Sequence, residues 1–240
     1  MEQKHRISIL ATDGQLYALD EYKRATSQSV TLSLIGIVLQ TESMGLVIAP
    51  NEIKKEWGKT NDYCTGIGED NVYKAFMLHS GYEDTKAIYN RQKINEISGV
   101  SVGSHTAAGY CWEHDFGGTP TRWHLPSLAE FALIATYDEE LDKVIEHLSY
   151  GFDIFVPDEN YWTSCEEGKD TAWAMTLEGR VHGETKNIEC RVRPVAKYEP
   201  LKPQDATAEE ISDEELVRML RDRGYVGKVT KEYTLKSRRK

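Results

Sequence analysis

Four cysteines and seven histidines are the side chains of this 240-residue chain best suited to metal binding or redox chemistry. The cysteines are Cys64, Cys111, Cys165 and Cys190. No C-x-x-C pair occurs, and the histidines match neither H-x-E-x-H nor H-x-x-x-H, spacings that bring two ligands together. We therefore expect no metal site, and thiols that are reduced and buried. Cys165 and Cys190 fall on two expected strands, and whether they pair stays open.

Patterns for acid–base or phosphate chemistry are weak. The sequence has no Gly-rich phosphate loop and no pair of carboxylates with a defined geometry. Buried thiols are poor nucleophiles, because an apolar environment disfavours the thiolate. We therefore expect a binding or structural protein and not an enzyme, with no catalytic residue and no cofactor.

The charge balance narrows the class of partner. The chain carries 29 basic and 39 acidic residues, a net charge of −10. An acidic surface disfavours nucleic acids and anionic membranes, so neither is expected as a partner. The charge is uneven, since residues 201–240 hold 10 basic and 8 acidic residues, against 19 and 31 in residues 1–200. An acidic body thus precedes a mildly basic tail.

No apolar stretch is long enough to cross a bilayer. The longest, residues 32–39, spans 8 residues, whereas a transmembrane helix needs roughly 18 or more. The apolar run at residues 7–11 is too short for a secretory signal, and no cleavage site follows it. The expected location is the cytoplasm in which the protein is made, or a particle assembled there.

The elements that must position any site begin with a β-rich segment. Aliphatic and β-branched residues predict strands at 6–11, 31–39 and 46–49, the last two forming a hairpin. Residues 16–24 are amphipathic and fit either a short helix or an extended lead-in. Together these elements make residues 1–60 a hairpin region that leads into the main domain.

Helical signals fill the middle of the chain. Asp70 can cap a helix that Gly81 ends, and Asp84 or Thr85 can open the next one. A helical turn is expected at residues 107–114.

Two further helices follow. Ser127 and Glu130 form the capping-box pattern S-x-x-E at a helix start. The next helix is expected from Asp138 to Leu148, where apolar residues recur at helical spacing.

The pattern then becomes β, with strands expected at 161–165, 171–177 and 188–195 and a turn at 178–180. Residues 61–198 are therefore the main domain, and residues 199–211, with Pro200 and Pro203, a linker.

Residues 212–240 predict a capped helix followed by a strand, too small to fold alone. We expect this unit to attach the protein to a partner or to a sister subunit, giving a homo-oligomer. Its apolar contact residues are Leu216, Val217, Leu220, Tyr225, Val229, Tyr233 and Leu235.

Six short motifs follow one another between residues 81 and 195. They are G-Y-E-D-T-K-A-I at 81–88, A-A-G-Y-C at 107–111, W-H-L-P-S-L-A-E-F at 123–131, Y-W-T-S at 161–164, A-W at 172–173 and V-R-P-V at 192–195. Together they resemble the Lcl-type branch of the C-type-lectin-like fold. That branch includes the diversified ligand-binding proteins encoded beside retroelements in phages and gut bacteria.

The resemblance implies an α+β fold with a small twisted antiparallel sheet, two or more helices and long loops. The motif residues are expected to pack the core rather than to form the site, because the tryptophans are large apolar bodies with one donor each. The residues that carry the fold signature are Trp123, Leu125, Pro126, Ser127, Glu130, Tyr161, Trp162, Trp173, Arg193 and Pro194.

Two chemistries known in lectin-like folds are not expected here. The calcium pattern E-P-N or Q-P-D followed by W-N-D is absent, and the nearest text is residues 157–160 and 172–174. The formylglycine-generating oxidases share the broad fold and use paired cysteines, but the residues around Cys165 and Cys190 do not match their motifs.

The family's ligand face lies between its Y-W and V-R-P-V strands. Here the candidate binding residues are Glu166, Glu167, Lys169, Asp170, Arg180, His182, Glu184, Lys186 and Asn187. Variable members favour Asn, Ser and Tyr on this face, so the charged residues of this chain favour a fixed structural contact.

The resemblance therefore implies a non-enzymatic structural or adhesion protein, a phage virion component such as a fibre, tail or head-attached protein. Its partners would be other virion proteins, sister subunits, or a cell-surface glycan or protein. A bacterial surface or secreted ligand-binding module is the alternative.

Overall fold

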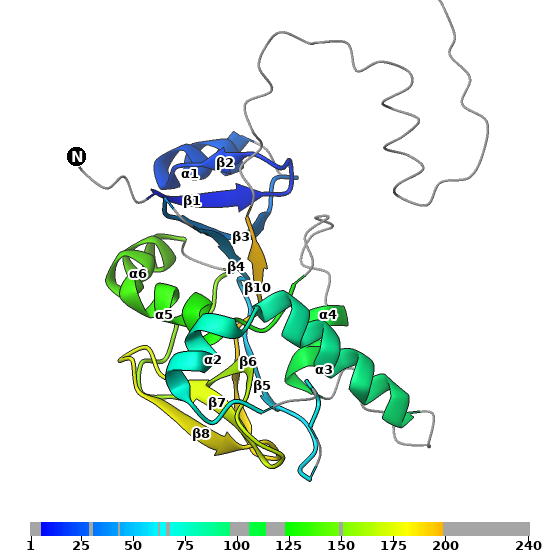
Figure 1. Ribbon diagram of the computed structural model, residues 1–240. Helices are drawn as coiled ribbons and strands as arrows, with labels where there is room; N and C mark the ends of the chain where they lie inside the picture. Colours follow the sequence, from blue (N-terminus) through cyan, green and yellow to red (C-terminus); the bar gives the residue numbers. More distant parts are fainter. Residues whose placement is uncertain are drawn as a thin grey trace, which may run out of the picture. The chain divides into compact units, whose positions relative to one another are not determined.

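The computed structural model describes residues 6–28, 31–42, 44–61, 63–65, 68–96, 106–113, 123–148 and 151–198 (Figure 1). All of them belong to one compact unit, Met1–Tyr198, and residues Glu199–Lys240 form a second. The expected linker and attachment unit, including all seven apolar contact residues from Leu216 to Leu235, lie outside the described residues. Their roles stay predictions.

The described unit has an α+β fold with six helices and two five-stranded, mostly antiparallel sheets. The strands are β1 (Arg6–Ala11), β2 (Leu16–Tyr17), β3 (Leu34–Gln40), β4 (Gly45–Ile48), β5 (Ile53–Glu56), β6 (Tyr161–Glu166), β7 (Thr171–Met175), β8 (Val181–Thr185), β9 (Glu189–Val192) and β10 (Val195–Lys197). The helices are α1 (Leu19–Gln28), α2 (Val72–Leu78), α3 (Gly81–Glu96), α4 (Ala107–Glu113), α5 (Leu128–Thr136) and α6 (Asp138–His147). The α+β class is as expected, but two five-stranded sheets replace the single small sheet.

Sheet A has the strand order β10-β4-β3-β1-β2. The expected hairpin is its centre, because β3 and β4 pair antiparallel with Ile37 opposite Ile48. The strand expected at 188–195 does not exist as one piece, since it divides into β9 in sheet B and β10 in sheet A. Pro194 lies at the break, where the missing N–H of proline cannot continue a ladder.

Sheet B has the order β5-β9-β6-β7-β8, with β6 and β9 parallel at Tyr161 and Arg191. The two edge strands, β5 (I-K-K-E) and β8 (V-H-G-E-T), were not expected from the sequence. Both are rich in polar residues, which suit the exposed edge of a sheet but give no apolar alternation to detect.

Two helix boundaries differ from expectation. Asn71, not Asp70, caps α2, because its side-chain oxygen accepts hydrogen bonds from the backbone N–H groups of Tyr73 and Lys74 at 3.0 and 3.2 Å. Gly81 begins α3 instead of ending α2. It is needed for close approach, since a Cβ there would lie 2.2 Å from Glu130 Oε2.

The helix at Ser127 is confirmed in detail. The Ser127 side chain accepts from the Glu130 backbone N–H, and the Glu130 side chain accepts from the Ser127 backbone N–H, which completes the capping box of α5. The helices expected at 107–114 and from Asp138 onward are present as α4 and α6.

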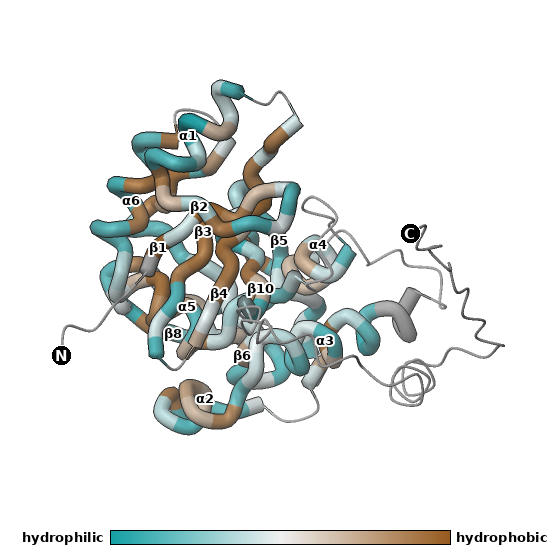
Figure 2. Tube along the Cα trace, turned by 90° about the horizontal axis from the view of Figure 1, so that it is seen from above, coloured by the Kyte–Doolittle hydropathy of each residue, from teal (hydrophilic) through white to brown (hydrophobic). Residues whose placement is uncertain are grey.

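Sheet B packs different helices on its two faces. One face meets α5, α6 and the β3–β4 hairpin, through a core that contains Ile37, Ile48, Phe131, Leu141, Tyr161, Trp173 and Met175. The other face meets α3 and α4, through Trp57, Ile88, Ala107, Cys111, Trp162, Ala174 and Val192. Figure 2 shows β3 and β4 in the brown of hydrophobic residues.

The motif tryptophans pack the core, as predicted. Trp123, Trp162 and Trp173 are buried, and the indole N–H groups of Trp162 and Trp173 donate to the carbonyls of Lys55 and Glu69 at 2.9 and 2.8 Å. These bonds satisfy the one polar atom of each buried ring. In the described part of the chain, no helix combines the length and the apolar character that crossing a bilayer requires.

Candidate functional site

The predicted ligand face follows the β7–β8 hairpin and the turns around it, and seven of its nine residues reach the surface. We call these seven the β8 rim: Glu167, Lys169, Asp170, Arg180, His182, Glu184 and Asn187. The other two, Glu166 and Lys186, have fully buried side chains, 0% exposed, so their assignment to a surface is wrong.

Glu166 and Lys186 form an ion pair beneath the rim. The Lys186 ammonium donates to Glu166 Oε1 at 2.5 Å, and Cys64 N–H donates to the same oxygen at 2.8 Å. Glu166 Oε2 accepts from Thr65, through the backbone N–H at 2.9 Å and the hydroxyl at 2.5 Å. A buried carboxylate is tolerated only with such full compensation.

Lys186 connects the pair to two further segments. Its ammonium also donates to the carbonyl of Lys169 at 3.0 Å and lies 5.0 Å from the centre of the Trp57 ring. Its own carbonyl accepts from the backbone N–H groups of Trp57 and Gly58 at 2.9 and 3.2 Å. The pair thus fixes the turn between β6 and β7 against the chain after β5.

The rim residues are spread along the whole length of β8. Lys169, Asp170 and Asn187 lie where β7 starts and β8 ends, and the Asp170 carboxylate accepts from the Asn61 N–H at 2.7 Å. Arg180 lies at the opposite end of the hairpin, beside Asp158 and Glu178 at 3.5 and 3.2 Å. The rim is therefore extended rather than one compact cluster.

The middle of β8 carries residues on both faces. His182 Nε2 lies 3.6 Å from Glu184 Oε2, with 42% and 27% of the two side chains exposed. On the opposite face, the Glu167 carboxylate lies over Gly183, where a Cβ would come within 1.8 Å of its Oε2. Gly183 thus makes room for an acidic side chain at the sheet edge.

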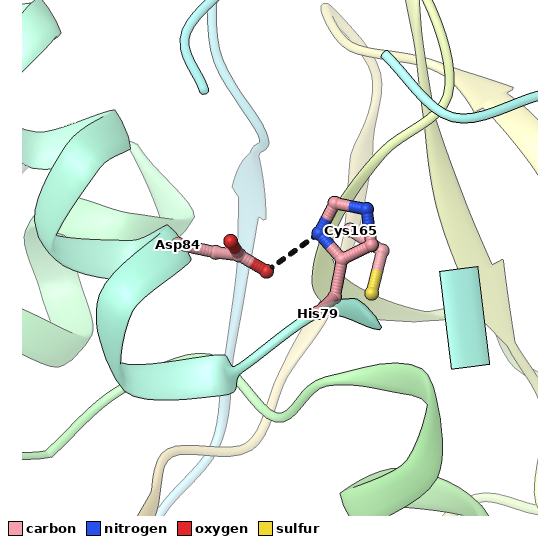
Figure 3. Close-up of side chains that lie close together, drawn as sticks. All are labelled: His79, Asp84 and Cys165. Carbon is pink, nitrogen blue, oxygen red and sulfur yellow. Dashed lines mark hydrogen bonds and ion pairs between the residues drawn. The ribbon is translucent and has the colours of Figure 1, made fainter. Parts of the chain in front are cut away.

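A second group of polar side chains was missed by the sequence reasoning. His79 follows α2, Asp84 lies in the first turn of α3, and Cys165 lies on β6, and the three converge in Figure 3. His79 Nδ1 is 2.8 Å from Asp84 Oδ2, and one ligand atom from each residue lies within 4.8 Å of the others. Eighty-one positions separate Asp84 from Cys165, so no local spacing could reveal the group.

The protonation of this group follows from its contacts. Hydrogen bonding to Asp84 raises the pKa of His79, against the opposing effect of burial. Burial raises the pKa of the Cys165 thiol to about 12, and the thiol lies 3.8 Å from the carbonyl oxygen of Ala75. Although histidine, aspartate and cysteine are the residue types of a nucleophilic triad, a buried, protonated thiol is not an activated nucleophile.

Cys165 and Cys190 do not form a disulfide. All four cysteines are described and buried, and none forms a disulfide. Cys165 and Cys190 belong to the cores on opposite faces of sheet B. Burial raises the pKa of Cys190 to about 12 as well, which argues against oxidase chemistry at either thiol.

The stretch nearest to a calcium pattern, residues 157–160, has its carboxylates paired with cations. Glu159 accepts from Arg191 Nε and Nη2 at 2.9 and 3.0 Å and lies 2.6 Å from the Lys54 ammonium. Arg191, followed by Lys54, lowers the pKa of Glu159 to about 2. Its charge is thus already matched by protein groups.

The sequence contains one G-x-S-x-G pattern, at residues 99–103, which lie outside the described residues. In α/β-hydrolases the serine of this pattern follows a strand and precedes a helix. Here the preceding element is the helix α3. The nearest described element before the pattern is thus a helix and not a strand.

No protein-family model matches the sequence, and no curated protein matches it. The structure is similar to a crystal structure of a fimbrial protein from Bacteroides ovatus, with 11% sequence identity and a TM-score of 0.46. The match covers 80% of this chain and 48% of that one, so this chain spans about half the length of the fimbrial protein. A structural similarity with so low a TM-score gives no information on the function of this chain.

Proposed function

We propose that the chain is a non-enzymatic structural or adhesion protein with a C-type-lectin-like domain, which holds its ligand against the β8 rim. The ordered motifs of residues 81–195 support the fold. The observation that carries the binding role is the buried Glu166–Lys186 pair, which anchors an exposed, polar and charged hairpin from beneath. A surface whose backbone is held in advance loses less entropy on binding.

Variants at each end of the rim test this role. One variant combines Arg180→Ala with His182→Ala, and a second combines Lys169→Ala with Asn187→Ala. Binding of the purified chain is compared on arrays of glycans and of bacterial surface proteins. We expect one of the two variants to lose binding about 10-fold or more, since polar contacts removed from a binding site each contribute about 1 kcal/mol or more.

The matched control combines Lys23→Ala with His147→Ala, both exposed and on helices α1 and α6, which contain no residue of the β8 rim. It is expected to bind as the parent does. If the parent binds nothing on either array, or if both rim variants bind as well as the control, the proposed site is wrong.

The proposed setting is a phage virion, as part of a fibre, the tail or the head, with residues 212–240 attaching the protein to virion partners or sister subunits. A bacterial surface or secreted module is the second candidate, because the family that the motifs resemble occurs in both settings. Mass spectrometry of purified particles, compared with the bacterial envelope, separates the two.

Truncation after residue 204 tests the attachment role. The full chain is expected to associate with particles or with itself, whereas the truncated chain stays folded but does not associate. A truncated chain that unfolds contradicts the division into a body and an attachment unit.

A further inference from the structure

Among the described residues, His79, Asp84 and Cys165 are the group whose ligand atoms lie close enough to share one ion. We propose that this group binds a single divalent cation of borderline softness, best matched by zinc. The site is separate from the β8 rim and adds a property that adhesion does not require.

The geometry needs only small adjustments. Zinc bonds of about 2.0–2.3 Å at tetrahedral angles place ligand atoms about 3.3–3.8 Å apart. The three ligand atoms lie within 4.8 Å of one another, with His79 Nδ1 and Asp84 Oδ2 hydrogen-bonded at 2.8 Å. Side-chain shifts of about 1 Å or less would therefore close the group around an ion.

The donor set selects the metal. One imidazole nitrogen, one carboxylate oxygen and one thiol sulfur make a mixed N, O, S set. Calcium and magnesium prefer sites made of oxygen alone, whereas zinc accepts all three donor types. The set therefore favours zinc, and cobalt(II) as its spectroscopic substitute.

The ligands are held in place by their surroundings. Ser164 Oγ donates to Asp84 Oδ2 at 3.2 Å, which orients the carboxylate and places a hydroxyl beside the group. Gly81 fixes the short connection between His79 and Asp84, because it packs against Glu130 Oε2 and the carbonyl of Leu125 with no room for a Cβ. Such supporting contacts are typical of metal sites.

One end of the group reaches the surface. The side chains of His79 and Asp84 are 12% and 16% exposed, whereas Cys165 lies at the buried end. The α2–α3 connection is thus the side from which solvent reaches the group. On binding, the thiol S–H bond breaks, a metal–sulfur bond forms, and the thiol proton passes to solvent. His79 Nδ1 gives up the proton that it shares with Asp84 while Nε2 carries one, so the imidazole binds the metal in its neutral form. No electron is transferred.

A bound ion would join the α2–α3 connection to β6. These elements lie far apart in the sequence but are held together by the core below the site. The expected consequence is a higher melting temperature of the parent chain in zinc, because a ligand that binds only the folded state stabilises it.

The test uses the full chain, reduced with a phosphine, stripped with chelator and dialysed. Zinc titration followed by calorimetry is expected to show saturable binding of one ion per chain. Cobalt(II) is expected to give a thiolate-to-metal charge-transfer band in the near ultraviolet. Cys165→Ser and His79→Gln should each weaken binding on the order of 100-fold, at least as much as the loss of a supporting contact.

The matched controls are Cys190→Ser and His147→Gln, which should bind as the parent does. The proposal is overturned if the parent chain shows no saturable zinc binding, or if its cobalt spectrum lacks the thiolate band. Both measurements use the parent chain, so they hold even if a variant fails to fold. Equal affinity in the cluster variants and the controls also overturns it.

Discussion

Replacing Lys186 with methionine is expected to lower the free energy of unfolding by about 3–5 kcal/mol, because it leaves a buried carboxylate without its cation. Both side chains of the Glu166–Lys186 pair are 0% exposed. The three hydrogen bonds from Cys64 and Thr65 remain, but they do not replace the lost positive charge. Urea unfolding followed by the fluorescence of the five tryptophans measures the loss.

A second variant separates charge from packing. Glu166→Gln combined with Lys186→Met removes both charges, so part of the lost stability should return. Lys59→Met is the control for an exposed lysine and should change stability by about 0.5 kcal/mol or less. If Lys186→Met costs no more than Lys59→Met, the pair does not hold the rim in the way described.

Replacing Arg193 with lysine is expected to cost at least about 2 kcal/mol, although the charge is kept, since each buried acceptor left unsatisfied costs about 1–3 kcal/mol. The Arg193 guanidinium is fully buried. It donates to the carbonyls of Ala49 and Pro50 at 3.1 and 3.0 Å and to Glu52 Oε2 at 2.6 Å. A lysine ammonium cannot reproduce this planar fork.

Arg193 also lies where the chain passes from β9 in sheet B to β10 in sheet A, and its guanidinium is 4.4 Å from the centre of the Phe155 ring. Arg193→Lys should therefore lower the urea concentration at which the body unfolds, and the body should still unfold in a single transition. Arg180→Lys is the matched control, because that side chain is 62% exposed. Equal stability of the two variants in urea unfolding would contradict the anchoring role of Arg193.

Local signals made part of the fold predictable. The β3–β4 hairpin and the capping box at Ser127 depend on neighbouring residues, and both are present as expected. The division of the last strand at Pro194 was not predicted, since apolar alternation runs straight through it. The polar edge strands β5 and β8 give no such alternation to detect.

The sequence predicted which segment of the chain holds the candidate site, but not which residues of that segment are exposed. Charged residues between β6 and β9 correctly marked surface turns, but Glu166 and Lys186 are buried because their partners come from distant segments. The group of His79, Asp84 and Cys165 depends on the packing of α3 against β6, which no spacing in the sequence encodes.

In the proposed function the β8 rim binds the ligand, whereas the buried Glu166–Lys186 pair beneath it only holds the rim in place. Its most direct test is to measure binding and melting temperature together for Arg180→Ala/His182→Ala and Lys169→Ala/Asn187→Ala. At least one variant is expected to lose binding about 10-fold or more, with a melting temperature that stays within a few degrees of the parent. Undiminished binding in both variants, or a loss that appears only with unfolding, would contradict it.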